Sequence, residues 1–414
     1  MFSEGLRRKA ETPNNEERMQ MRKYAWIAKM LPLALLWLGA AAGTAAAAPE
    51  APPEPSAAPA PSGPVPLKLT QVQFVDARHG WTVGTKSDET DTTVWKTTDG
   101  GRRWRAVALG GGVRNAAIGM ADEKHGWAVG PADCRDEAGT SVCGKTTVLH
   151  THDGGDTWFS QWSRPDPAAN ADNEVDPIAE ASAVVRVRSS LMKTTDFGQT
   201  WTDISLGSPE AHPYTISFAN DAVGYAAGRI GPDCPEKGMV PATPNANCRT
   251  AVWKTKNGGR SWTLLPHAPR KSGAWYPVAI QFPDPRNGYL LLVNPDTHAS
   301  LLYFTSNGGS NWTLRNAKIP GIRPYAVKLE FVNPRTGYVP LSVGAGPVEG
   351  GLLKTVNGGA TFTKLADRRL VSVEDADFLT PQRGYVVAMN PDNPNARLVL
   401  GTADGGDRWT DLTP

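Results

Sequence analysis

One eight-residue pattern recurs seven times along this chain of 414 residues. The first copy runs from Thr97 to Trp104 and reads TTDGGRRW, and the shared template is Thr-x-(Asp/Asn)-x-Gly-x-x-Trp, with Phe362 as the one change in its last column. The copies begin at residues 97, 151, 194, 255, 305, 355 and 402, a mean spacing of about 51 residues. Self-similarity at this period predicts a propeller or a solenoid.

A second motif precedes six of the seven copies, and it ends in Gly followed by Trp or Tyr, as in Gly80-Trp81. The third unit is degenerate and has Ala183-Val184-Val185 at this place. Runs with period-2 alternation, bounded by Gly, Asp and Pro, then give four short strands in each unit. Four antiparallel strands are the blade of a β-propeller. We therefore predict an all-β, seven-bladed propeller over residues 67–414, with no helix.

The recurring residues of the eight-residue pattern are interpreted as structural. The third-position Asp or Asn accepts hydrogen bonds from N–H groups of its own turn, and the fifth-position Gly supplies a positive φ. The final aromatic buries about 150–250 Å² over the seam between strands and blades. A catalytic group is not needed seven times. The structural set is Asp99, Asp153, Asp196, Asn257, Asn307, Asn357, Asp404, Trp104, Trp158, Trp201, Trp262, Trp312, Phe362 and Trp409.

Residues 1–48 have the pattern of a secretory signal. Arg22, Lys23 and Lys29 precede an apolar run from Met30 to about Ala48 that ends in an alanine tract. An uncleaved membrane anchor is the alternative, because the run approaches the ~20 residues that span a bilayer. Residues 49–66 are rich in Pro and Ala and predict a stiff spacer. We expect an exported protein, in the extracellular space, at the cell surface or in the periplasm.

The four cysteines form two local pairs, Cys134 with Cys143 and Cys234 with Cys248. An export signal and an even cysteine count favour a disulfide within each pair. Zinc is the alternative, but eight and thirteen intervening residues match no zinc spacing. Without residues 1–48 the net charge is about −1, because 36 basic and 37 acidic residues are left. This balance argues against a nucleic-acid partner.

Loop lengths differ between the two faces of the predicted propeller. Long segments lie between second and third strands (131–146, 229–250, 390–397) and between blades (159–177, 266–277, 315–325), and both kinds emerge on one face. Variable loops on a rigid scaffold are a usual place for binding. Aromatic and basic residues where these loops enter the channel form a candidate partner site; the alternative is that they only cap the channel mouth. This set is Trp162, Arg164, Tyr214, Trp275, Tyr276, Arg323 and Tyr325.

The repeated Thr-x-Asp-x-Gly-x-x-Trp resembles the Asp-box (BNR) motif of sialidases, sortilin-type receptors and related propellers. Its combination with Gly-(Trp/Tyr)-x-x-Gly in seven blades resembles the photosystem II stability/assembly factor family and its exported bacterial relatives, over roughly residues 67–414. The resemblance implies a role in the assembly or stability of a membrane protein complex, which would be photosystem II in a photosynthetic host. Fold alone does not fix function.

The sequence favours no enzyme class. The Phe/Tyr-Arg-Ile-Pro element that sialidases usually carry is missing. Glu374, Asp375 and Asp377 form an acidic run, which we interpret as a solvated strand start, although paired carboxylates also serve glycosidases. His150 and His152 lie on one face of a strand without a third ligand, so neither a metal nor a cofactor is predicted.

We therefore expect a non-enzymatic, monomeric scaffold that binds a protein partner at the cell envelope. The alternative is a propeller that binds or cleaves cell-wall glycans, with Trp275, Tyr276 and Tyr325 as sugar-stacking platforms.

Overall fold

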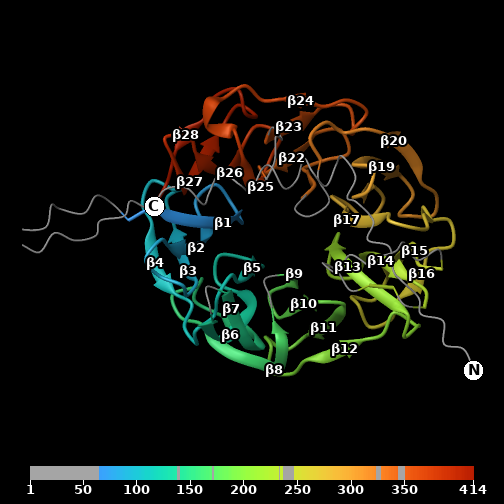
Figure 1. Cartoon of the computed structure of the whole chain (residues 1–414), viewed down its shortest axis with the longest axis horizontal. Helices are drawn as coiled ribbons and strands as arrows, with labels where there is room; N and C mark the ends of the chain where they lie inside the picture. The colour runs from blue at the N-terminus through green and yellow to red at the C-terminus, as the bar shows by residue number, and fades with distance from the viewer. Residues whose placement is uncertain are drawn as a thin grey trace, which may run out of the picture. The chain divides into compact units, whose positions relative to one another are not determined.

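The computed structural model describes residues 65–137, 140–169, 172–232, 234–235, 247–322, 328–343 and 350–414. These residues form seven four-stranded antiparallel sheets, each from four consecutive strands. The sheets stand as blades around a central channel (Figure 1), so the predicted seven-bladed β-propeller is confirmed. One 3₁₀ turn, η1 (Arg368–Leu370), is the helical element of the described chain. The predicted signal and all but the last two residues of the predicted spacer lie outside the described residues.

The strands of each blade follow one another along the chain, from the innermost to the outermost. Their bounds are β1 (Leu67–Phe74), β2 (Gly80–Lys86), β3 (Thr93–Thr97) and β4 (Arg105–Ala108) in blade 1; β5 (Ala117–Met120), β6 (Gly126–Glu137), β7 (Thr140–Thr151) and β8 (Phe159–Ala169) in blade 2; β9 (Asn173–Ala179), β10 (Ser182–Val187), β11 (Ser190–Thr194) and β12 (Thr202–Ile204) in blade 3; β13 (Ala211–Phe218), β14 (Gly224–Ile230), β15 (Arg249–Thr255) and β16 (Thr263–Leu264) in blade 4; β17 (Tyr276–Gln281), β18 (Gly288–Asn294), β19 (Ala299–Thr305) and β20 (Thr313–Asn316) in blade 5; β21 (Glu330–Phe331), β22 (Gly337–Leu341), β23 (Gly351–Thr355) and β24 (Thr363–Lys364) in blade 6; and β25 (Val373–Phe378), β26 (Gly384–Asn390), β27 (Asn393–Thr402) and β28 (Thr410–Asp411) in blade 7.

The eight-residue pattern forms the turn between the third and fourth strands of each blade. In the first copy the Thr97 hydroxyl accepts the Gly101 N–H at 2.9 Å, and Asp99 Oδ1 accepts the Arg103 N–H at 2.9 Å. Gly101 has a φ of 88°, which favours glycine. The corresponding bonds recur in the other six copies, so the hydrogen bonds that the pattern predicts are present.

The Gly-(Trp/Tyr) motif is explained by packing between neighbouring blades. Phe74 pairs with Gly80 across β1 and β2, and a Cβ on Gly80 would lie 2.3 Å from the Phe74 ring. The glycine therefore leaves room for the ring. In blades 4 to 7 the Tyr after the glycine stacks on the corresponding Phe of the next blade, with ring centroids 3.3–3.5 Å apart. The stacked pairs are Tyr225–Phe282, Tyr289–Phe331, Tyr338–Phe378 and Tyr385–Phe74.

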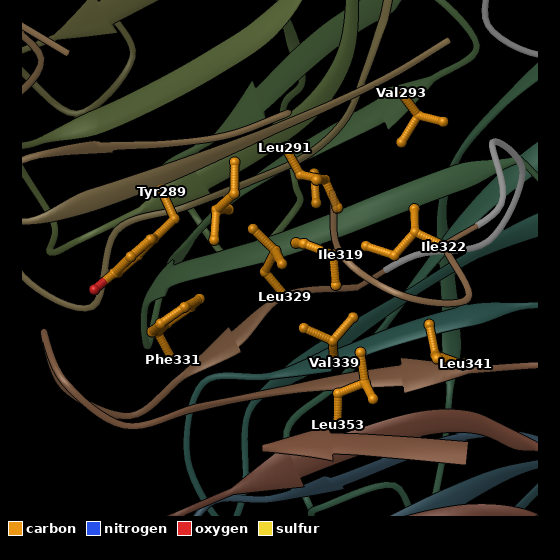
Figure 2. Close-up of a cluster of buried hydrophobic side chains, with 12 residues drawn as sticks. Tyr289, Leu291, Val293, Ile319, Ile322, Leu329, Phe331, Val339, Leu341 and Leu353 are labelled. Carbon is orange, nitrogen blue, oxygen red and sulfur yellow. The ribbon is translucent and has the colours of Figure 1, made fainter. Parts of the chain in front are cut away.

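Figure 2 shows one such seam, between blades 5 and 6. The rings of Tyr289 and Phe331 lie together at one end of an apolar cluster that continues through Leu291 and Val339. Ile319, from the segment that joins the two blades, fills the space between them. Each seam thus has its own apolar core, as propellers built from radially repeated sheets require.

The ring is closed by side chains. Because every blade consists of four consecutive strands, the seam between blades 7 and 1 has the same construction as the internal seams. Tyr385 stacks on Phe74 at 3.5 Å, and the Trp104 indole donates to the Leu412 carbonyl at 2.6 Å. The final aromatic of the first copy therefore covers the closing seam.

Three of the six segments predicted as long loops are mainly strands. Residues 131–146 continue the β6–β7 hairpin, 159–177 hold β8 and most of β9, and 390–397 hold a short turn between β26 and β27. The sequence prediction was wrong there because Pro and Asp were interpreted as loop markers, whereas these strands extend past the blade body. Blade 3 has all four strands, and its Ala183 pairs with Pro177 and Thr194 in the register of the missing Gly.

Candidate functional site

Each inner strand presents one residue to the channel at the same register. This residue pairs with the aromatic residue of the Gly-(Trp/Tyr) motif, as Gln73 pairs with Trp81, or with Val184 at that place in blade 3. We call the seven residues at this position the channel ring: Gln73, Gly119, Asp176, Ser217, Gln281, Glu330 and Asp377. Side chains alternate along a strand, so the residue two positions earlier points the same way. Glu174, Lys328 and Asp375 occupy that second position in blades 3, 6 and 7.

Two cavities occupy the channel. The larger measures about 560 Å³, and its walls include Gln73, Asp176 and Asp377. The other measures about 410 Å³ and reaches Glu330. Both have Lys328 in their lining, so they adjoin within the channel.

The channel ring also holds neighbouring blades together. Gln73 Oε1 accepts the Met120 N–H of blade 2 at 2.8 Å, and Asp377 Oδ2 accepts the Phe74 N–H of blade 1 at 2.6 Å. Asp176, Ser217 and Gln281 make the same kind of bond to the next blade. An inner strand has no strand partner on its channel side, so the N–H groups along that edge lack backbone acceptors. The side chains of the channel ring accept hydrogen bonds from these N–H groups.

Carboxylates dominate the charge of the described channel. Lys328 Nζ lies 3.1 Å from Asp375 Oδ1 and 3.6 Å from Glu330 Oε2. Asp375 is 6% exposed, and its other oxygen accepts the Val72 N–H at 2.9 Å. The interpretation of the acidic run as a solvated strand start was therefore wrong, because Asp375 and Asp377 bind backbone of blade 1 inside the channel.

Burial in the channel disfavours the charged form of these acids. It raises the pKa of Asp176 to about 7, with repulsion from Glu174 adding to it and the Phe218 N–H opposing it. Burial likewise raises the pKa of Asp377 to about 6 and that of Glu330 to about 8, although Lys328 opposes both shifts. Such groups exchange protons near neutral pH.

The structure brings together part of the predicted partner site. Tyr214 and Tyr276 stack with centroids 6.1 Å apart, and the Arg229 guanidinium lies 4.7 Å from the Tyr276 ring centre. Tyr214 is only 1% exposed, and its hydroxyl donates to the Pro235 carbonyl. Its assignment as a surface contact was therefore wrong: it anchors the segment between β14 and β15. Trp275 is half-buried against the apolar core of blades 4 and 5.

The other members of the set do not join this group. Trp162 and Arg164 lie on β8, the outermost strand of blade 2, with the Arg164 guanidinium 5.6 Å from the Trp162 ring centre. They are thus away from the channel mouth where the sequence prediction put them, because residues 159–169 form an outer strand and not part of a loop. Arg323 and Tyr325 lie outside the described residues.

Both predicted disulfides are confirmed. Cys134 and Cys143 lie opposite each other across β6 and β7. Cys234 and Cys248 bridge the segment between β14 and β15. Arg229 Nη2 donates to the Cys248 carbonyl at 3.2 Å and to the Gly273 carbonyl at 2.6 Å. The segment is therefore tied to blade 4 and to the connection before blade 5.

The two histidines differ in environment. His150 is 4% exposed against the Trp127 and Phe197 rings, and burial lowers its pKa to about 4. His152 is exposed and stacks on Phe159 at 5.4 Å. Within the described ranges, no three side chains of the metal-ligating types come together, and no helix is long and apolar enough to cross a membrane.

Comparison with known proteins finds similarity in structure. No family model and no curated protein matches the sequence. The structure is similar to that of YCF48 bound to D1 peptide (17% identity, TM-score 0.50, covering 82% of this chain and 93% of that one). It is also similar to the BP39L lectin from Burkholderia pseudomallei (14% identity, TM-score 0.52, 83% and 98% covered). A looser match is the GH74 enzyme from Niastella koreensis (11% identity, TM-score 0.30, 83% and 71% covered).

A protein that binds a peptide and a lectin are both similar in fold to this chain, so the fold alone does not decide between a protein ligand and a glycan ligand. The resemblance predicted from the repeats is confirmed at the level of fold: this chain is a seven-bladed propeller similar to YCF48, a photosystem II assembly factor.

Proposed function

We propose that this chain is an exported, non-enzymatic propeller that binds a protein partner at the cell envelope, in the manner of an assembly or stability factor for a membrane protein complex. The observation that carries the proposal is the likeness in fold to YCF48, whose structure holds a D1 peptide. The likeness covers nearly all of both propellers. From this likeness we infer that the chain binds a segment of its partner on one face of the rigid ring.

The surface formed by Trp275 and Tyr276, here called the tyrosine rim, is the place we propose for that contact; the buried Tyr214 and Arg229 pack against Tyr276 and support it. It is prepared in advance: the Cys234–Cys248 disulfide and the two carbonyl bonds of Arg229 hold its segments. A surface that is already ordered loses less conformational entropy on binding. Trp and Tyr are also the residues that most often carry the energy of an interface.

A glycan ligand is the second candidate, and the likeness to the BP39L lectin favours it. Aromatic faces stack on sugars, but the Tyr276 ring already has Arg229 over it and Tyr214 beside it. Trp275, which is half-buried, is then the platform left among the described members of the set.

The test is binding of the purified chain to a peptide library and to a glycan array, side by side. Trp275→Ala removes the rim aromatic, and Phe159→Ala is the matched control because Phe159 is 47% exposed on the outer strand of blade 2. We expect peptide binding that Trp275→Ala weakens by at least tenfold, about 1.4 kcal/mol, and that the control leaves unchanged. Glycan binding without peptide binding would replace the proposal with the lectin reading.

A further inference from the structure

Four kinds of contact join neighbouring blades, and each recurs around the ring. A channel-ring side chain accepts an N–H of the next inner strand, as Gln73 does. The Tyr of the Gly-(Trp/Tyr) motif stacks on the Phe of the next blade. The motif's aromatic residue also donates to a carbonyl there, as Trp81 Nε1 donates to the Gly154 carbonyl at 2.8 Å. A lysine before the eight-residue pattern donates to another such carbonyl, as Lys96 Nζ does to that of Asp153 at 2.9 Å.

Every seam except the one between blades 2 and 3 combines at least two of these contacts. The closing seam between blades 7 and 1, for example, has the Asp377 carboxylate on the Phe74 N–H and the Tyr385–Phe74 stack. Further donors to a carbonyl of the next blade are Tyr225, Tyr289, Tyr338, Lys193, Lys254 and Lys354.

The seam between blades 2 and 3 has none of the four in the described part of the chain. The channel-ring residue of blade 2 is Gly119, which has no side chain, and Pro177 beside it has neither an N–H nor an aromatic ring. Trp127 is the aromatic residue of the motif in blade 2, and its Nε1 has no hydrogen-bond partner. His150 stands where four other blades have the lysine, and its Nε2 has no partner either.

These two nitrogens weaken the closed seam. Trp127 is fully buried and His150 is 4% exposed, so water does not reach them. A buried polar atom without a partner loses its hydrogen bond to water when the seam closes and gains none in return. The tyrosines and lysines of the other seams gain a hydrogen bond at the same places. The seam between blades 2 and 3 therefore gains less free energy when it closes.

Other contacts keep this seam closed in the structure. Trp127 and Val185 belong to an apolar cluster that both blades share, but each of the other seams has such a cluster too. Two ion pairs also cross the seam, Arg188–Asp166 at 3.3 Å and His125–Glu180 at 3.6 Å. Solvent-exposed ion pairs contribute little, so they do not replace the missing hydrogen bonds.

We propose that the ring opens first at the seam between blades 2 and 3, and that the other six seams are still closed when it does. Strand β9 follows β8 along the chain, so the two blades stay tethered and the seam can close again. The first and last blades meet at another seam, which the Asp377 bond and the Tyr385–Phe74 stack hold. The point of opening is thus not the place where the two ends of the propeller meet.

The test compares how fast a thiol reagent reaches a cysteine buried at one register in three seams. Val185, Val339 and Val386 are fully buried at this register, and each belongs to the apolar cluster shared with the preceding blade. The four natural cysteines are all in disulfides, so each Val→Cys variant has one free thiol. With excess N-ethylmaleimide under native conditions, we expect Val185→Cys to react at least about tenfold faster than Val339→Cys or Val386→Cys, because local opening sets the rate. Melting curves first establish that the variants are folded.

Two further changes exchange the lysine and the histidine between seams. His150→Lys gives blade 2 the donor of the other blades and should slow the reaction of Val185→Cys. Lys354→His removes the bond to the Gly405 carbonyl and should speed the reaction of Val386→Cys. Equal rates in the three single variants, a slower rate in Val185→Cys, or no effect of either exchange overturns the proposal. If Val185→Cys does not fold, Ala183→Cys takes its place, because Ala183 is fully buried in the same cluster.

Discussion

Replacing Phe74 with Ala should remove the aromatic contact that closes the ring. Phe74 is 3% exposed, stacks on Tyr385 at 3.5 Å and meets the edge of Trp104 at 6.2 Å. A buried Phe→Ala change costs about 3–5 kcal/mol. Gly80 opposite leaves no Cβ that could move into the space, so we expect about 4 kcal/mol, within that range.

Urea unfolding followed by tryptophan fluorescence measures this loss as a shift of the midpoint at unchanged slope. Phe331→Ala at the seam between blades 5 and 6 is the matched comparison, since Phe331 is 2% exposed and stacks on Tyr289 at 3.5 Å. The two variants should lose the same stability, because both seams are held by side chains. A loss below about 1 kcal/mol for Phe74→Ala, in the range of surface changes, would refute the reasoning.

Three further results are expected. Replacing both Cys234 and Cys248 with Ser should lower the free energy of unfolding by about 3 kcal/mol, because the disulfide closes a short loop. The strand content measured by circular dichroism should not change. Loss of the strand signal would contradict this. His150 favours its neutral form in the folded chain, so its stabilising contribution to folding is present above about pH 6.5 and is lost as the pH falls through about 4. His150→Phe should therefore flatten the curve of unfolding free energy against pH in that window. An unchanged slope would contradict this. Gly80→Ala should lower the melting temperature through the Cβ contact at 2.3 Å with the Phe74 ring, whereas a neutral result would mean that the ring can shift.

The repeats made the fold predictable. The hydrogen bonds accepted by Thr97 and Asp99 each join residues four positions apart. One copy of the pattern therefore contains both the donors and the acceptors of its turn. The Phe74–Gly80 pair is nearly as local. Seven repetitions of such units, at a mean spacing of about 51 residues, determine a ring of blades. The cysteine pairs followed from proximity in sequence and an expected oxidising compartment.

The candidate site was harder to predict, because its contacts join distant parts of the chain. Asp377 bonds to Phe74 across 303 residues, and its sequence neighbourhood resembles an exposed strand start. Tyr214 is buried by the segment that holds Pro235, which local sequence does not reveal. A signal was available, because a polar residue stands immediately before a Phe at the end of the inner strand in five blades. These residues are Gln73, Ser217, Gln281, Glu330 and Asp377, and their recurrence indicates that they make the same kind of contact.

The most direct test of the account is affinity capture from an envelope extract with three forms of the chain: the parent, Trp275→Ala and Phe159→Ala. Melting curves first establish that all three are folded. We expect one discrete membrane protein that the parent and Phe159→Ala retain and that Trp275→Ala loses. Retention of cell-wall polysaccharide without a protein, or equal retention of the same protein by all three forms, would contradict it.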